Sequence, residues 1–324
     1  MITVTNLAIQ FGKRVLYKDV NLKFTHGNIY GIIGANGAGK STLLKAISGE
    51  LEPNKGTVEM APGERMSILE QDHFKYDAFS VMNTVIMGHQ PLWENIKAKE
   101  ALYCKEDFSD EDGILVAELE EKYAEMGGWT AESDAAQLLQ HLGIPETLHQ
   151  KQMSELSNTE KVRVMLAKAL FGNPDNLLLD EPTNDLDLDM IEWLEGFLNR
   201  GNKTLLMVTH DRFFLDRVCN IIMELDDQTI YTYRGNYSYY LDKRQERIDN
   251  KRAEIARANN LYRRELEWMR RQPQARGHKA RYREEAFVDL EKVAKQRIEE
   301  RQMRLKRSNV YIGSKIFECQ YVSK

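Results

Sequence analysis

Residues 34–42 read Gly34-Ala35-Asn36-Gly37-Ala38-Gly39-Lys40-Ser41-Thr42, and this stretch decides the fold. It fits the pattern G-x-x-x-x-G-K-[ST] in full. The apolar run 29–33 before it is typical of a buried strand, and residues 43–47 after it are typical of the first turns of a helix. A strand, a loop and a helix in this order predict a phosphate-binding loop. The alternative, a chance match in a glycine-rich turn, leaves the flanking strand and helix unexplained.

The residue types of this loop suit a bound nucleotide. Glycines let the backbone fold around phosphates without Cβ clashes, and successive N–H groups then point into one concavity at the positive end of a helix dipole. Lys40 is expected to reach the β- and γ-phosphates, and the Ser41 hydroxyl to ligate Mg²⁺. The loop residues expected to touch the nucleotide are Gly34, Asn36, Gly37, Ala38, Gly39, Lys40, Ser41 and Thr42.

The composition is that of a globular protein without a membrane span. The chain has 324 residues, of which 29% are charged, and no apolar run approaches about 18 residues. The N-terminus lacks the charged and long apolar regions of a secretion signal. Cys104, Cys219 and Cys319 lie far apart and form no ligand pair, so we expect buried thiols in a reducing compartment, the cytoplasm.

Charge is distributed unevenly along the chain. Residues 243–307 hold 21 Lys and Arg against 11 Asp and Glu, a balance of +10. The net charge of the whole chain is −5, so the remainder carries −15. An acidic body with one basic segment indicates a localised anionic partner.

The chain divides into β-rich and helical stretches. Residues 1–24 alternate as an antiparallel β edge, and residues 80–150 follow helical spacing, which predicts an inserted helical subdomain. Residues 177–180 and 204–210 are apolar without alternation, as in parallel strands buried on both faces. Further elements are expected at 40–48 (a helix capped by Gly49), 187–199 (a helix) and 221–240 (short strands that carry five tyrosines).

The basic segment 242–307 predicts a helical hairpin. It is highly charged, with sparse apolar stripes on either side of Pro273 and Gly277. We expect two long antiparallel helices joined by a turn at 272–278. After it, residues 309–324 return to β-type sequence and loosely echo residues 2–8, which indicates the start of an internal repeat.

A second constellation lies at the end of the apolar run 177–179. Asp180 and Glu181 follow this predicted strand directly. In a phosphate-loop fold, an aspartate at that position holds Mg²⁺, directly or through water. The adjacent Glu181 is placed to polarise a water for in-line attack on the γ-phosphate. Two acidic residues at a strand end are weak evidence for a site by themselves, but together with the loop at 34–42 they become strong evidence.

With these residues in view, the chain resembles the ATP-binding-cassette superfamily. Residues 181–187 are similar to the family's switch carboxylate and the loop that follows it. The resemblance implies that Gln71 couples Mg²⁺ to the helical subdomain and that His210 is the switch histidine at the γ-phosphate. It also places Phe11 where these domains stack an aromatic ring on adenine. The implied ligands are ATP and Mg²⁺, with Ser41, Gln71 and Asp180 on the metal.

The signature position departs from the family pattern. Where the family has Leu-Ser-Gly-Gly, this chain has Leu156-Ser157-Asn158-Thr159, followed by Glu160. Ser157 and Glu160 have the spacing of a capping box at a helix start. The resemblance implies that this helix N-terminus faces the γ-phosphate held by a partner cassette. Asn158 and Thr159 then place Cβ atoms where glycines allow a close backbone approach.

Within the superfamily, the chain most resembles the ABC-F group, whose members carry two cassettes and a basic helical-hairpin linker. We predict a nucleotide-binding domain at 1–241 with a helical insertion at about 80–150, a linker at 242–307 and a strand stub of a second cassette at 308–324. The implied function is that of an ATP-binding half of a soluble ATPase on the ribosome, in translation or antibiotic protection. Hydrolysis to ADP and phosphate then requires a second cassette, and no membrane is involved. The linker residues expected to contact ribosomal or transfer RNA are Arg263, Arg264, Arg270, Arg271, Arg276, Lys279, Arg281 and Arg283.

Alternatives remain at this point. A transporter ATPase uses the same nucleotide residues with a separate membrane subunit, but it needs no basic arm. A DNA-repair ATPase of related fold normally carries metal-binding cysteines, which this sequence lacks. The hairpin itself has a simpler interpretation, a solvated charged spacer.

Overall fold

The computed structural model describes residues 1–12, 14–105, 109–226, 228–270 and 281–295. The chain forms two compact units that meet between Arg244 and Gln245. We describe each unit by itself. Among the helices of the described residues, none combines the length and the hydrophobicity of a membrane span.

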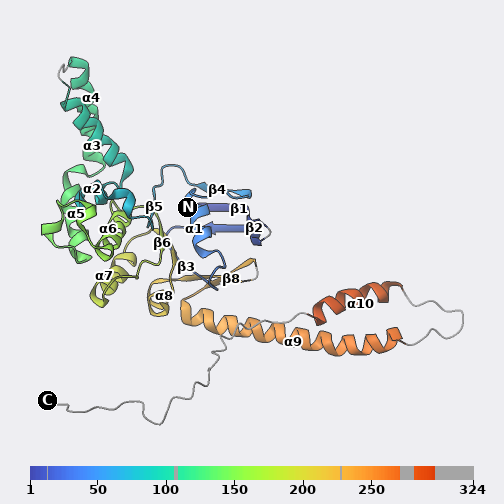
Figure 1. Cartoon of the computed structure of the whole chain (residues 1–324). Helices are drawn as coiled ribbons and strands as arrows, with labels where there is room; N and C mark the ends of the chain where they lie inside the picture. The colour runs from blue at the N-terminus through green and yellow to red at the C-terminus, as the bar shows by residue number, and fades with distance from the viewer. Residues whose placement is uncertain (13, 106–108, 227, 271–280, 296–324) are drawn as a thin grey trace, which may run out of the picture. The chain divides into compact units, whose positions relative to one another are not determined.

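A six-stranded sheet forms the centre of the first unit (Figure 1). Its strand order is β5-β6-β7-β3-β8-β9, and every neighbouring pair is parallel except β8 and β9. Leu177 and Leu179 pack into one hydrophobic cluster and Leu178 into the other, so β6 is buried on both faces, as its unalternating sequence predicts. The strands are β3 (Ile29–Gly34), β5 (Met66–Ile68), β6 (Asn176–Asp180), β7 (Thr204–Val208), β8 (Ile221–Asp226) and β9 (Thr229–Arg234).

The predicted antiparallel β lobe is a three-stranded sheet in the order β2-β1-β4. Its strands are β1 (Ile2–Phe11), β2 (Arg14–Phe24) and β4 (Lys55–Met60). Helix α1 (Lys40–Ser48) shares a hydrophobic cluster with this lobe and with one face of the central sheet. It ends at Gly49, whose φ of 82° confirms the predicted cap.

The helical subdomain packs against the opposite face of the central sheet through one continuous hydrophobic cluster. In Figure 1, α3 and α4 extend from it as a pair. The sequence-predicted helix at 187–199 is α7. The helices are α2 (Val81–Ile86), α3 (Gln90–Tyr103), α4 (Asp110–Glu125), α5 (Ala131–His141), α6 (Asn158–Leu170), α7 (Leu188–Leu198) and α8 (Arg212–Val218). One-turn 3₁₀ helices span Phe74–Tyr76, Gly128–Thr130, Glu146–Leu148 and Met153–Glu155.

Two sequence predictions about this unit are wrong. The strands expected at 221–240 end at Arg234, because the Asn236 side chain and carbonyl accept from the N–H groups of Tyr239 and Tyr240 and start a helix there. Cys219 is buried as expected, but Cys104 is exposed because it lies at the end of α3, away from the core. Cys319 lies outside the described residues.

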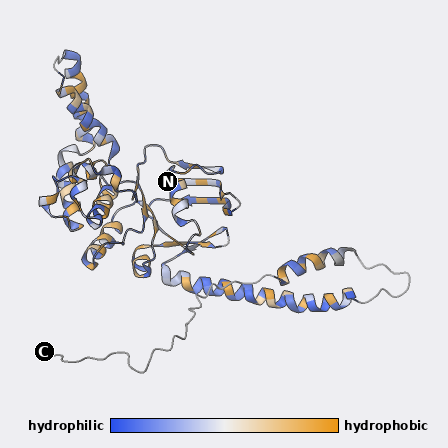
Figure 2. Cartoon of the chain, viewed as in Figure 1, coloured by the Kyte–Doolittle hydropathy of each residue, from blue (hydrophilic) through white to orange (hydrophobic). Residues whose placement is uncertain are grey.

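The second unit holds most of α9 (Tyr237–Arg270) and α10 (Arg281–Ala294). Most of α9 is hydrophilic in Figure 2, as its charged sequence requires. The rings of Tyr262 and Phe287 stack at 5.2 Å, and the Tyr262 hydroxyl donates to Glu291 across 3.2 Å, so the two helices pack together. The predicted turn at 272–278 and the strand stub at 308–324 lie outside the described residues. The predicted domain boundary at 241 stays a prediction.

Candidate functional site: a nucleotide cradle at the ends of β3, β6 and β7

The predicted phosphate loop connects the end of β3 to the start of α1. Gly37 and Gly39 have φ of 76° and 102°, in the left-handed region that L side chains rarely adopt. A Cβ on Gly39 would lie 2.5 Å from the Tyr17 hydroxyl, and one on Gly34 would lie 2.8 Å from the Leu225 carbonyl oxygen. The loop therefore requires glycine at these positions, and its N–H groups are left at the N-terminus of α1.

Lys40 lies over this loop. Its side chain is buried, and the ammonium donates to the carbonyl oxygens of Gly34 and Ala35 across 3.0 and 3.4 Å. Both acceptors are weaker partners for an ammonium than a phosphate oxygen, which makes a charge-assisted hydrogen bond. The cradle of glycines and the cation held above it fit the triphosphate of a nucleotide.

Gln71 and Asp180 meet at one end of the central sheet. Strands β5 and β6 are parallel neighbours with Ile68 opposite Leu178, so the residues that follow each strand emerge together. The amide Nε2 of Gln71 donates to Oδ2 of Asp180 across 2.8 Å. This leaves amide and carboxylate oxygens at one place, and such hard oxygen ligands suit Mg²⁺. The residues present therefore fit the ion that the sequence predicts.

Glu181 and His210 are brought together in the same way by β6 and β7. The backbone N–H of His210 donates to Oε2 of Glu181 across 3.3 Å, and Nε2 of His210 lies 3.6 Å from Oε1. The His210 side chain is 64% exposed and the Glu181 side chain 25%. Glu181 has a φ of 53°, a left-handed conformation that costs a residue with a Cβ about 1–2 kcal/mol. This strain sits at the carboxylate that the sequence predicts to be catalytic.

The capping box predicted at the signature is confirmed. The Ser157 hydroxyl accepts from the Glu160 N–H, and the Glu160 carboxylate accepts from the Ser157 N–H across 2.8 Å. Hydrogen bonds from the Ser157 hydroxyl and backbone lower the pKa of Glu160. Asn158 and Thr159 open helix α6 with exposed side chains. The position of this turn against a partner cassette stays a prediction.

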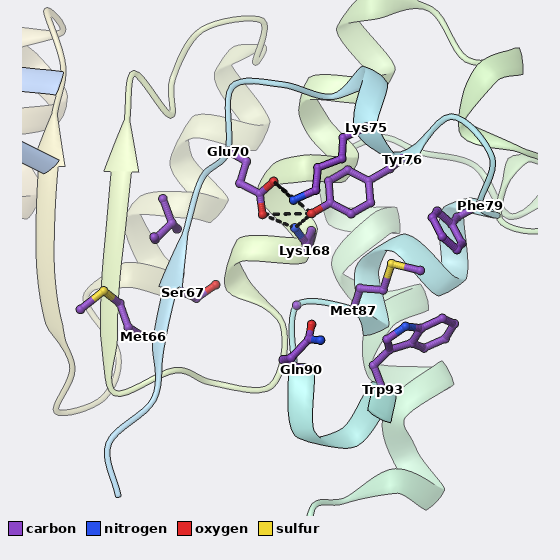
Figure 3. A pocket seen from close by; sticks show the side chains of 12 residues that line it. Met66, Ser67, Glu70, Lys75, Tyr76, Phe79, Met87, Gln90, Trp93 and Lys168 are labelled. Carbon is purple, nitrogen blue, oxygen red and sulfur yellow. Dashed lines mark hydrogen bonds and ion pairs between the residues drawn. The ribbon is translucent and has the colours of Figure 1, made fainter. Parts of the chain in front are cut away.

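An ion-pair network beside Gln71 was not predicted from the sequence (Figure 3). Buried Lys168 of α6 donates to Glu70 across 2.7 Å and to the Tyr76 hydroxyl across 2.5 Å, and the Tyr76 hydroxyl donates to Glu70 across 3.0 Å. Burial raises the pKa of Glu70, but the hydrogen bond and charge of Lys168 outweigh it, and the pKa is lowered. Burial lowers the pKa of Lys168. The network lines a cavity of about 440 Å³ between β5 and the helical subdomain. The sequence did contain one indication of this network, because Lys168 is a lone charged residue within the apolar run 164–170.

Two residues of β2 also reach the phosphate loop without having been predicted. Nη2 of Arg14 donates to the carbonyl oxygen of Gly37 across 2.6 Å, and the hydroxyl of buried Tyr17 donates to that of Gly39. Phe11, expected against the adenine, is 53% exposed at the end of β1. The β lobe therefore both contacts the phosphate loop, through β2, and carries the aromatic ring, at the end of β1.

A buried carboxylate fixes the start of α9 to the central sheet. Glu224 of β8 is 4% exposed and accepts from the Tyr240 hydroxyl across 3.1 Å and from Nε of Arg244 across 2.7 Å. Tyr233 donates to the same carboxylate across 3.3 Å. The first turns of α9 are thereby part of the first unit.

The predicted RNA contacts are only partly described. Arg263, Arg264 and Arg270 are exposed on α9. Arg271, Arg276 and Lys279 lie outside the described residues, as do the side chains of Arg281 and Arg283. The described residues therefore do not test whether this set forms one surface, and its role stays a prediction.

Residues 17–184, more than half of the chain, match the sequence profile of the family described as ABC transporter. This chain belongs to the ABC transporter family. Residues 223–306 match a second ABC transporter profile, which covers β8 to the basic segment. The cassette is thus an ABC ATP-binding domain, and members of this family hydrolyse ATP and work as pairs of cassettes.

Curated relatives are similar along most of this chain. The uncharacterized ABC transporter ATP-binding protein YkpA of Bacillus subtilis is 56% identical over 76% of this chain and 45% of its own length. The probable ATP-binding protein YbiT of Escherichia coli O157:H7 is 47% identical over 74% of this chain and 46% of its own length. The energy-dependent translational throttle protein EttA of Mycobacterium tuberculosis is 34% identical over 97% of this chain and 56% of its own length. The chain spans about half the length of these relatives.

Solved structures agree on the fold. The ATP-binding subunit of an ABC transporter superposes with a TM-score of 0.54 at 21% identity, over 72% of this chain and 90% of its own. A dimeric ATP-binding cassette with ADP and Pi superposes with a TM-score of 0.52 at 22% identity, over 72% of this chain and 98% of its own. The mixed sheet, β lobe and helical subdomain predicted from the sequence are confirmed as the fold of an ABC cassette.

Proposed function

We propose that this chain is the ATP-binding half of an ABC-F ATPase that acts on the ribosome. The observation that carries the ATPase part is the 2.8 Å hydrogen bond between Gln71 and Asp180, set beside Glu181 and His210. This bond and its neighbours bring the groups proposed to ligate Mg²⁺ and to activate water to one end of the sheet, which β3 also reaches at the phosphate loop. The ribosomal part is supported by similarity to a protein named translational throttle over 97% of this chain.

Each residue of the cradle has a role in this proposal. The N–H groups of the loop and Lys40 hold the β- and γ-phosphates, and Phe11 stacks on the adenine. Mg²⁺, when bound by Ser41, Gln71 and Asp180, neutralises charge on the phosphates. Glu181 accepts a proton from the attacking water, and His210 contacts the γ-phosphate and orients Glu181.

Turnover in this proposal needs a second cassette. The alignments cover 45% and 46% of the length of two relatives, and ABC cassettes work as pairs. The N-terminus of α6 then approaches the nucleotide bound by the partner, so Ser157, Asn158, Thr159 and Glu160 act on the other site. The single cassette is accordingly expected to bind ATP and to hydrolyse it poorly.

The basic segment directs the pair to RNA in this proposal. Its charge of +10 over residues 243–307 complements a phosphate backbone, and a ribosome-bound role places the protein in the cytoplasm. Co-sedimentation with purified ribosomes at increasing salt is the test. Binding that weakens with salt and strengthens with ATP supports the proposal, whereas no ribosome binding at low salt contradicts it.

A transporter subunit is the second candidate, because one relative is named an ABC transporter ATP-binding protein. In that case the chain would associate with a membrane subunit instead of ribosomes. Fractionation of cells into membranes and ribosomes separates the two candidates. Recovery with membranes that persists after ribosomes are removed would favour the transporter.

A further inference from the structure

Phe11 and Arg14 face each other across the end of the β1–β2 hairpin. They are the last paired residues of the two strands before the turn. Arg14 also donates to the carbonyl oxygen of Gly37 in the phosphate loop across 2.6 Å. One side chain thus connects the strand end that carries the aromatic ring with the loop expected to hold the phosphates.

The phosphate loop is the better-fixed partner in this contact. The Ala38 N–H donates to the Ala35 carbonyl across 3.0 Å, Lys40 donates to Gly34, and Tyr17 donates to Gly39. The loop is also continuous with β3 at one end and α1 at the other.

The hairpin end is held by fewer contacts. Phe11, Gly12 and Arg14 are exposed, and the pairing of β1 with β2 shifts register three times between Val4 and Gln10. The Gln10 N–H bonds to the Asn54 side chain, and the Gln10 amide donates to the Gly12 carbonyl oxygen within the hairpin end itself, so neither bond fixes the hairpin end to the phosphate loop. The bond from Arg14 therefore positions the hairpin end on the loop, and not the reverse.

We propose that Arg14 is a positioning residue that sets the separation between the adenine-stacking ring of Phe11 and the phosphate loop. The inference rests on the proposed binding of ATP. A stacked base contributes binding energy only if the ring lies at the distance that the ribose and phosphates impose. Arg14 provides this distance because its guanidinium binds the loop while its backbone pairs with Phe11.

Tyr17 provides a contrast on the same strand. Its hydroxyl donates to the carbonyl oxygen of Gly39, next to Lys40, and the residue is 1% exposed in the core of the β lobe. Loss of this hydroxyl disturbs the part of the loop that holds the phosphates. A change at Tyr17 is therefore expected to affect every triphosphate, whereas a change at Arg14 affects only a triphosphate that carries a base.

The test is a calorimetric titration of the chain with Mg²⁺ and either ATP or inorganic tripolyphosphate. Arg14→Gln should weaken ATP binding about two- to tenfold, the range of one exposed hydrogen bond, and leave tripolyphosphate binding unchanged. Tyr17→Phe should weaken both. The matched control is Lys18→Gln, which removes an exposed cation from the same strand and should change neither.

A double-mutant cycle with Phe11→Ala identifies the route of the effect. If Arg14 acts through the ring, Arg14→Gln added to Phe11→Ala should weaken ATP binding no further. Equal losses for ATP and tripolyphosphate would overturn the proposal, because Arg14 would then act on the phosphates by charge. Additive losses, or no loss at all, would also overturn it. A wild-type chain that binds tripolyphosphate and ATP equally contradicts the base stack itself, and one that binds neither contradicts the proposed function.

Discussion

The amide of Gln71 and the carboxylate of Asp180 are hydrogen bonded across 2.8 Å, although 109 positions separate them in the sequence. The contact exists because β5 and β6 are parallel neighbours and both chains leave the sheet at the same end. Gln71 begins the segment that continues into the helical subdomain, so in the proposed function a change at the Mg²⁺ position would reach that subdomain through this side chain. The site and the subdomain are thereby connected at the level of individual bonds.

Lys40→Ala should abolish ATP binding and preserve the fold. The ammonium is the cation held over the cradle, and charge-assisted hydrogen bonds to two phosphates correspond to a loss of about a hundredfold or more. Calorimetry with ATP and circular dichroism measure the two outcomes. Lys45→Ala, an exposed lysine on the same helix, is the control and should bind ATP normally. Unchanged affinity in the Lys40 variant would remove this residue from the site.

Glu181→Gln should stall hydrolysis with ATP bound in a two-cassette protein. The amide keeps the shape of the side chain but cannot accept a proton from water. Turnover should fall by about 10²–10⁴, and the protein should remain on ribosomes in the presence of ATP. Phosphate release and co-sedimentation are the measurements. A full-length variant with wild-type turnover would show that another group activates the water.

Glycine at positions 158 and 159 should raise turnover in a two-cassette protein without changing stability much. In the proposed pair of cassettes, the two native side chains would crowd the γ-phosphate of the partner site, and loss of one backbone donor there costs roughly 10²–10³ in rate. Ser157 and Glu160 still cap α6 in the variant, so the thermal midpoint should barely move. Phosphate release and thermal unfolding test both statements. Equal turnover in the two proteins would mean that Asn158 and Thr159 are tolerated.

Glu70→Gln should destabilise the cassette more than Lys168→Met does. The first change leaves the buried ammonium without its carboxylate, at a cost of about 1–3 kcal/mol, whereas the second removes the charge that needs pairing. The double variant should therefore resemble Lys168→Met alone in urea unfolding. Glu52→Gln, at an exposed position, is the control.

This ion pair also predicts a pH dependence. The pKa of Glu70 is lower in the folded chain than in the unfolded one, so its contribution is complete above the unfolded value of about 4.3 and disappears as the pH falls through the folded value. The stability difference between wild type and Glu70→Gln should be constant from pH ~5 to neutral pH, where Lys168 stays protonated, and narrow below pH ~4. A difference that widens on acidification would contradict the assignment.

Replacement of Arg270, Arg271, Arg276 and Arg281 by Glu should weaken ribosome binding and flatten its salt dependence. Removal of one cation from an RNA phosphate reduces the slope of log affinity against log salt by about 0.7–0.9. The matched control changes Lys18, Lys23, Lys45 and Lys55 to Glu, an equal change of charge at exposed positions of the cassette. If only the control alters binding, or if neither does, the hairpin is a spacer.

Local patterns identified the parts of this molecule that have a short-range cause. The phosphate loop, the unalternating strand at 177–179 and the capping box at Ser157 follow from spacing and residue type alone. Lys168 and Arg14 were missed because their partners are distant in sequence, at Glu70 and Gly37, and only the packed fold brings them together. The tyrosines after residue 236 were misassigned because β propensity was outweighed by a single capping asparagine.

The left-handed backbone at Glu181 creates a trade-off between thermal stability and activity at this position. Asparagine adopts this conformation with less strain than glutamate, so Glu181→Asn should hold the end of β6 at least as firmly while it removes the carboxylate. A laboratory selection that rewards only resistance to heat would therefore accumulate variants at position 181 that fold well and turn over no ATP. Efforts to raise the thermal stability of this cassette must therefore keep Glu181 unchanged and introduce stabilising substitutions elsewhere in the chain.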